Sequence, residues 1–328
     1  MTATPTHTNK KVALVVGASR GIGRQVAIDL AANGYAVVVA SKSYDQTPYA
    51  GARFPPDPNS NQSTINTVER EIREAGGEAT ALRVDTSDPV SVEQVVAQTV
   101  QKYGRLDAVI YNAGAIWWAP VKDTPLKRFM LMQRVNAEGL YGIVQAALPH
   151  LTKRDPAATP PKIGGRIVVV SPPIYSRFFR GKTAYAMGKV AMSVLTKGLA
   201  MDFEREGLAD EMAITSIWPA VAIESAATDQ FTRQDPKMAN DLRKPTIFSD
   251  AILAMLRAPA AVVNGQLELD EDFLRRHAGV DDFSKYSVVP GMVPRRIMPA
   301  ELPDLTVREQ DDEGQRINLA DEKVKGKL

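Results

Sequence analysis

The chain has 328 residues, enough for one large domain or two small ones, and 40 Lys and Arg stand against 38 Asp and Glu, so the net charge is +2. Because the two signs are interspersed, neither nucleic acid nor an anionic membrane is expected as a main partner. The absence of cysteine excludes disulfides, thiolate metal ligands and a catalytic cysteine, and no metal site is predicted.

Residues 1–10 are polar and rich in threonine, and we expect them to form an N-terminal tail without the apolar stretch of a signal peptide. No later run approaches the roughly 18 apolar residues of a membrane span. A soluble, cytoplasmic protein is therefore expected. The last three residues, Gly326-Lys327-Leu328, bear a weak similarity to the peroxisomal Ser-Lys-Leu signal, which leaves the peroxisome as an alternative.

Short apolar strands alternate with amphipathic helical patterns from residue 11 onward. The strands are predicted at 12–16, 37–39, 81–84, 108–110, 167–170 and 214–218. Helical patterns lie at 22–31, 64–75, 90–103, 125–151 and 183–206. This alternation predicts an α/β fold, a Rossmann-type doubly wound parallel sheet with helices on both faces. We expect a single domain over 11–270.

Three stretches depart from this pattern. Prolines and polar residues at 44–63 indicate a long loop inserted after the second strand, and 153–165 reads as a Pro/Gly-rich loop before the fifth strand. Beyond residue 270 the sequence is charged and punctuated by proline. We expect a C-terminal extension over 271–328 that lies over the domain or is partly disordered.

A glycine turn joins the first strand to the first helix. Gly17, Gly21 and Gly23 enclose Ser19, Arg20 and Ile22 in the spacing Gly-x-x-x-Gly-x-Gly. Glycines at such a turn let a pyrophosphate approach main-chain N–H groups at the positive end of the helix dipole. The turn therefore predicts a dinucleotide site.

The same turn also satisfies Gly-x-Ser-x-Gly, which makes a serine hydrolase with Ser19 as nucleophile an alternative. Such a nucleophile needs a histidine base and an oxyanion loop from an earlier strand. No strand precedes this one, and His150 and His277 are the only histidines downstream. These two facts argue against the hydrolase.

The residues after the second strand bear on the choice of cofactor. NAD-binding proteins usually place an acidic residue there for the ribose 2′-hydroxyl, whereas NADP-binding proteins use a cation for the 2′-phosphate. The chain has Ser41 and Lys42 at this point, with Arg20 as a second cation. NADP(H) is favoured, and Asp45 a few residues on leaves NAD(H) open.

Tyr185 and Lys189 stand four residues apart in a helical pattern, so both side chains lie on one face of that helix. A nearby ammonium favours a phenolate, and we expect Lys189 to lower the pKa of Tyr185. The pair opens the helix after the fifth strand, and Ser171 stands at the end of that strand.

With these residues in this order, the chain resembles the short-chain dehydrogenase/reductase family over residues 11 to about 225. The matching pieces are the glycine turn, Asp85, Asn112-Ala113-Gly114, Asn136, Ser171, Tyr185 and Lys189. Within the family it looks similar to the hydroxysteroid dehydrogenase-like protein 2 group, without the carrier-protein domain that some members append. The residues that carry this likeness are Lys42, Ser171-Pro172-Pro173, Lys244-Pro245 and Gly265-Gln266.

The resemblance implies a role for each matching residue. Tyr185 would exchange a proton with the substrate oxygen, Lys189 would hold the nicotinamide ribose, Ser171 would hydrogen-bond the substrate oxygen, and Asn136 would support a water path. Asp85 and the backbone of Asn112, Ala113 and Gly114 would hold the adenine and its ribose, and Val221 would contact the nicotinamide amide.

Two departures from the family pattern affect these roles. Pro172 stands where many relatives have a second serine, so Ser171 could align with the non-catalytic serine of that pair. Glu224 stands where a threonine is usual. The resemblance also implies a homo-dimer or homo-tetramer joined through the helices at 125–151 and 183–206.

Aromatic residues gather in the loops after the fourth, fifth and sixth strands: Trp117, Trp118, Tyr175, Phe178, Phe179 and Trp218. The carboxyl-end loops of such a sheet form the ligand crevice, and the segment 223–244 is expected to cover it. We predict an NADP(H)-dependent oxidoreductase that interconverts an apolar ketone or aldehyde and the corresponding alcohol. An NADP(H)-binding sensor with little turnover is a further alternative.

Overall fold

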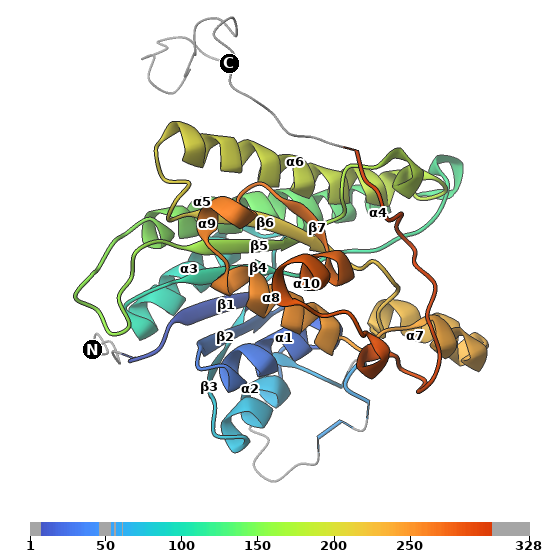
Figure 1. Ribbon diagram of the computed structural model, residues 1–328, viewed down its shortest axis with the longest axis horizontal. Helices are drawn as coiled ribbons and strands as arrows, with labels where there is room; N and C mark the ends of the chain where they lie inside the picture. Colours follow the sequence, from blue (N-terminus) through green and yellow to red (C-terminus); the bar gives the residue numbers. More distant parts are fainter. Residues whose placement is uncertain (1–7, 46–53, 56, 61, 304–328) are drawn as a thin grey trace, which may run out of the picture.

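The computed structural model describes residues 8–45, 54–55, 57–60 and 62–303. Within them, seven strands form one parallel sheet in the order β3-β2-β1-β4-β5-β6-β7 (Figure 1). Their bounds are β1 Val12–Val16, β2 Ala36–Ser41, β3 Glu78–Arg83, β4 Ala108–Tyr111, β5 Arg166–Val170, β6 Ala213–Trp218 and β7 Leu267–Leu269. The central strands are aliphatic runs buried on both faces, as a sheet covered on both sides requires.

Ten α-helices lie within the described residues. They are α1 Gly21–Ala32, α2 Ile65–Glu74, α3 Pro89–Tyr103, α4 Leu126–Gln133, α5 Gly139–Leu151, α6 Thr183–Arg205, α7 Ala226–Gln234, α8 Thr246–Arg257, α9 Ala260–Val263 and α10 Asp270–Ala278. Shorter 3-10 turns are η1 Val121–Asp123, η3 Ser176–Phe179, η4 Pro236–Asp241 and η5 Ser284–Tyr286, and η2 Arg134–Glu138 is a π-helical turn.

The helices cover both faces of the sheet. Helices α1, α2, α8 and α10 contribute buried side chains to the core on one face, and α3, α5 and α6 to the core on the other. This confirms the predicted doubly wound parallel α/β fold, and the six predicted strands are all present.

The helix predicted over 125–151 is interrupted by the π-helical turn η2, which joins α4 to α5. Isolated π turns within α-helices often occur at functional sites. Five helices and strands were not predicted from the sequence, namely α7, α8, α9, β7 and α10.

The chain beyond residue 270 begins with α10, whose Phe273 and Leu274 are buried in the core beside α8. The following segment reaches residue 303 across the surface and returns to the loop after β6, where Ile297 N donates to Ala220 O at 2.8 Å. Arg296 is held to Asp272 of α10 by two hydrogen bonds of 2.8 and 2.7 Å. The expected extension is therefore packed on the domain over 271–303.

Several expectations concern residues outside the described ranges. They include most of the tail at 1–10, much of the loop at 44–63 and the last three residues of the chain. Among the helices that the structure does describe, not one combines the length and the apolar character needed to cross a bilayer.

Candidate active site

A cavity of about 670 Å³ opens at the carboxyl ends of the central strands. It is lined by the glycine turn, by Ser41 and Lys42 after β2, by Asp85 after β3, and by residues 112–116 after β4. Tyr185 and Lys189 of α6 line the same cavity, together with Trp218 and the residues that open α7. The structure thus places most of the predicted site residues around one cavity.

The glycine turn fits closely against the end of β4. A Cβ atom on Gly17, whose φ is +87°, would lie 2.6 Å from the backbone nitrogen of Ala113, and one on Gly23 would lie 2.1 Å from Gly17 O. Asn112 holds the two segments together, because its Nδ2 donates to Gly17 O at 2.9 Å. The turn leaves the first N–H groups of α1 beside the cavity, which suits a pyrophosphate.

Lys42 and Asp85 form an ion pair at the rim of the cavity, with Nζ and Oδ2 2.6 Å apart. Partial burial by itself raises the pKa of Asp85, but hydrogen bonds from Lys42 and Ser87 outweigh it and hold that pKa at about 2. Ser41 Oγ donates to Ser19 Oγ at 3.3 Å, which links the second strand to the glycine turn. A charged ammonium and an ionised carboxylate therefore flank the place expected for the adenine ribose.

Tyr185 and Lys189 are both buried at the inner end of the cavity. Lys189 Nζ donates to Val170 O at 2.8 Å, so the amine is anchored to the end of β5. A Cβ atom on Gly114 would lie 3.3 Å from this Nζ and 3.3 Å from Asn136 Oδ1, so the three residues meet closely. Lys189 and Gly114 therefore form one continuous wall of the cavity.

The expected effect of Lys189 on Tyr185 is wrong for the protein without cofactor. Burial raises the pKa of Tyr185 above its ordinary value and lowers the pKa of Lys189 to about 7. The phenol ring lies against Trp118 and Phe178, each with its ring centre 6.1 Å away. Desolvation by these rings disfavours the phenolate, and the amine loses charge for the same reason.

Asn136 lies in the π-helical turn η2 and is fully buried. Its Oδ1 accepts from Ala115 N at 2.9 Å, and its Nδ2 donates to Ala115 O at 3.2 Å. Asn136 therefore positions the backbone after β4, which lines the cavity on this side.

Ser171 and Val221 do not reach the cavity. Ser171 is fully buried, and its Oγ accepts from Ser193 Oγ at 3.0 Å on the side facing α6. Val221, in the loop after β6, is buried and forms a backbone bridge with Arg296. Val170 and Ala222, one residue away from each, line the cavity instead.

Some residues of the lining were missed by the sequence analysis. Ile297 comes from the C-terminal extension, and Ser225 and Thr228 form the capping box that begins α7. A capping box can be read from sequence, because hydroxyl side chains at these positions bond reciprocally to the backbone. The approach of Ile297 depends on long-range contacts and leaves no local signal.

Aromatic rings cluster around Tyr185 as expected, although not all six contribute equally. Trp118 and Trp218 line the cavity, and Phe178 packs edge-on against Trp218 with ring centres 5.5 Å apart. Phe231 of α7 stacks on Trp118 at 5.8 Å and was not predicted. Trp117 packs under Arg128, and Tyr175 packs against Ala220 and Leu269.

The hydrolase alternative lacks a base in this arrangement. Ser19 is buried and lines the cavity, but neither His150 nor His277 does. His277 lies on α10 against the ring of Phe273. Within the described part of the chain, no group of three His, Cys, Asp or Glu side chains could hold a metal ion.

Comparisons with known proteins agree with this arrangement. The sequence profile of the short chain dehydrogenases matches residues 11–54 and 58–235. Hydroxysteroid dehydrogenase-like protein 2 of Danio rerio is 34% identical over 280 residues, which cover 84% of this chain and 60% of the relative. The chain thus spans only three fifths of that protein.

Solved structures give the same result. A short chain dehydrogenase of Mycobacterium thermoresistibile is 32% identical, with a TM-score of 0.73 over 88% of this chain and 95% of that one. A 7α-hydroxysteroid dehydrogenase complexed with NADH and 7-oxo glycochenodeoxycholic acid is 25% identical, with a TM-score of 0.60 over 79% and 92%. More distant structures with this fold hold NADP or NADPH.

Proposed function

Because this chain belongs to the short chain dehydrogenase family of oxidoreductases, we propose that it uses NADP(H) to interconvert an apolar ketone or aldehyde and the corresponding alcohol. The observation that carries the proposal is that Tyr185 and Lys189 line the same cavity as the glycine turn. A nicotinamide dinucleotide, when bound, supplies or accepts the hydride at the carbonyl carbon. The side chains of the protein handle the proton and the position of the reactants.

Tyr185 is proposed as the acid in reduction. Its raised pKa keeps the hydroxyl protonated at neutral pH in the cofactor-free protein, which is the form that can give a proton to a developing alkoxide. The buried setting among Trp118 and Phe178 also excludes water from the reacting atoms.

Lys189 and Asn136 are proposed to position the reactants. Lys189 uses one N–H for Val170 O and keeps further donors for the hydroxyls of a nicotinamide ribose. Asn136 holds the backbone of Ala115 at the wall of the cavity. Ser171 is not assigned a part in the proton transfer, because its hydroxyl bonds to Ser193 away from the lining.

The cavity wall at the substrate end suits an apolar molecule. Trp118, Trp218 and Ile297 line it, and Phe231 covers Trp118 from α7. Aromatic and aliphatic walls with few polar groups bind apolar ligands and fix their orientation through a small number of hydrogen bonds.

Turnover tests this proposal directly. NADPH oxidation is followed with a panel of apolar ketones and aldehydes, using the unchanged protein and Tyr185→Phe. Loss of the hydroxyl should lower kcat by about 10²–10⁴-fold while NADPH still binds, since the ring remains in place. NADPH binding without turnover of any compound in the unchanged protein would instead favour the sensor, and ester cleavage lost in Ser19→Ala would favour the hydrolase.

The choice of NADP(H) rests on Lys42, whose side chain is 68% exposed at the rim, where its ammonium pairs with Asp85 and keeps further N–H donors for a 2′-phosphate. Lys42→Ala should weaken NADPH binding by about tenfold or more, because a charge-assisted contact is lost. NADH binding serves as the internal control and should change much less. Equal losses for the two cofactors, measured by fluorescence titration, would contradict this assignment.

A further inference from the structure

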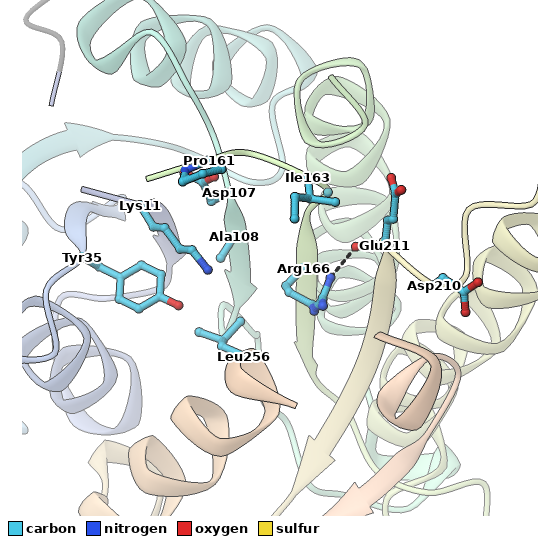
Figure 2. Close-up of a pocket in the computed structure, with 11 residues that line it drawn as sticks. Lys11, Tyr35, Asp107, Ala108, Pro161, Ile163, Arg166, Asp210, Glu211 and Leu256 are labelled. Atoms are coloured by element: carbon cyan, nitrogen blue, oxygen red, sulfur yellow. Dashed lines mark hydrogen bonds between the residues drawn. The ribbon is translucent and has the colours of Figure 1, made fainter. Parts of the chain in front are cut away.

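A second cavity, of about 220 Å³, lies at the opposite edge of the sheet (Figure 2). Lys11 and Tyr35 directly precede β1 and β2, and Ala108 and Arg166 begin β4 and β5. Because the strands are parallel, this is the edge formed by their amino ends, away from the active site. The two cavities share no lining residue.

Arg166 is an incompletely satisfied cation in this cavity. Its Nη1 donates to Gly165 O at 3.2 Å and to Glu211 O, so its acceptors are main-chain carbonyls, and its Nε is buried without a hydrogen-bond partner. Burial lowers the pKa of the guanidinium. A partly buried charge without a counterion is unfavourable, and an anion placed beside it would offset that cost.

Two further donors point into the same space. Figure 2 shows the amine of Lys11 and the hydroxyl of Tyr35 directed toward the middle of the cavity, on the side facing Arg166. In the part of the chain that the structure describes, neither group has a hydrogen-bond or ion-pair partner. Lys11, Tyr35 and Arg166 therefore offer an ammonium, a phenol and a guanidinium to one ligand.

The acidic side chains near this cavity do not neutralise these donors. Asp107 is bound by Arg105 at 2.7 and 2.8 Å and by Val12 N at 2.8 Å, so its oxygens are occupied. The carboxylate of Glu211 pairs with Arg154. Asp210 is exposed, and Figure 2 shows it on the far side from Lys11.

We propose that this cavity binds a small molecule through a phosphate or carboxylate group held by Lys11, Tyr35 and Arg166. Arg166 would supply the positive charge of its guanidinium, Lys11 a mobile ammonium, and Tyr35 a neutral donor. The volume corresponds to about seven water molecules, which suits the anionic group and a short carbon chain. Pro161, Ile163 and Leu256 provide apolar wall for that chain.

Inorganic phosphate and succinate serve as probes, with sodium chloride of equal ionic strength as the reference. The midpoint of thermal unfolding of the full chain is followed as each anion is added. We expect a saturable rise with at least one of the two probes beyond that seen with chloride. The half-saturating concentration should increase about tenfold or more in Lys11→Met and in Arg166→Leu, since each removes a charged donor.

Two further variants, Lys10→Met and Lys42→Ala, serve as controls. Lys10→Met removes a neighbouring lysine that pairs with Glu78 outside the cavity, and its response should match the unchanged protein. If Arg166→Leu does not fold, Lys11→Met decides the outcome, because Lys11 is exposed. Lys42→Ala, at the rim of the proposed nucleotide site, shows whether the anion binds at that site instead of in this cavity.

Three results would overturn the proposal. The first is a response to phosphate and succinate no greater than that to chloride, and the second is a response that Lys11→Met leaves unchanged. The third is a response lost only in Lys42→Ala, which would place the anion at the nucleotide site. Because no step of this test requires turnover or bound NADPH, its failure is distinguishable from failure of the proposed function.

Discussion

Lys189 is a fully buried amine whose pKa is lowered by burial from 10.5 to about 7. Between these two pH values the unfolded chain carries a proton on this lysine that the folded chain lacks. Stability therefore rises with pH across this window, and below pH 7 the cost of burying the amine is fully present. The slope from one such group is at most about 1.4 kcal/mol per pH unit.

We predict that Lys189→Met reduces this dependence. Urea unfolding of the cofactor-free protein at intervals from pH 7 to 10 should give a smaller rise in the free energy of unfolding for the variant than for the unchanged protein. Lys162 and Lys182 have pKa values lowered by burial as well, so the difference between the two proteins is the relevant quantity. Tyr185→Phe is the control, because it keeps Lys189, and parallel curves for all three proteins would refute the assignment.

At the scale of single residues, the sequence predicted which side chains line the candidate active site better than it predicted their protonation states. The spacing of Tyr185 and Lys189 predicted one helix face, and both residues do line the cavity. The pKa of Tyr185 could not be predicted, because it depends on Trp118 and Phe178, which come from other loops. The role of Ser171 was implied by the family resemblance, but the backbone turns its hydroxyl toward Ser193.

Among the elements, α10 shows why the C-terminal part was difficult to predict. Its charges suggested a tail, yet their order suits a helix, because Asp270, Glu271 and Asp272 fill the first turn and Arg275, Arg276 and His277 the last. Acidic residues near the N-terminus and basic residues near the C-terminus complement the helix dipole. Burial of Glu271 depends on Arg243, 28 residues earlier, at 2.9 Å, a contact that local sequence does not reveal.

A substitution of Phe273 tests how much the packing of α10 contributes to the stability of the domain. Its ring is buried between α10 and the core beneath α8, so Phe273→Ala should lower the free energy of unfolding by about 3–5 kcal/mol in urea titrations. Arg275→Ala on the same helix is the matched control, since its side chain is 50% exposed, and should change stability by less than about 0.5 kcal/mol. Similar small effects of both changes would mean that α10 is only loosely attached.

For the whole molecule, the alternation of strands and helices was sufficient to predict the parallel sheet. It also placed the expected ligand crevice at the carboxyl ends of the strands, the edge at which the larger cavity opens. It did not reveal that the extension returns to this edge through Ile297, or that the opposite edge holds a second cavity lined by Lys11 and Arg166. Both depend on segments that are distant along the chain, such as the pairing of Arg296 with Asp272. Local sequence patterns therefore predict the layers of the fold, whereas its cavities also depend on tertiary contacts.

Assembly is a further property of the whole molecule. Large apolar side chains are exposed on the helices of one sheet face. Leu126 on α4, Tyr141 on α5, and Met187 and Val194 on α6 are each more than half exposed, at 70%, 57%, 53% and 57%. Apolar surface gathered on neighbouring elements is typical of protein interfaces. We expect it to join copies of this chain into a dimer or tetramer.

Size-exclusion chromatography with light scattering measures this directly at micromolar concentration. Replacing Tyr141 and Val194 together by Glu should shift the mass toward that of one 35.7 kDa chain, because burying two unpaired carboxylates in an interface costs several kcal/mol. Val262→Glu, at an exposed apolar residue of α9 outside this group of helices, is the control and should leave the mass unchanged. A monomeric unchanged protein, or an oligomer that survives both substitutions, would show that these helices do not form the interface.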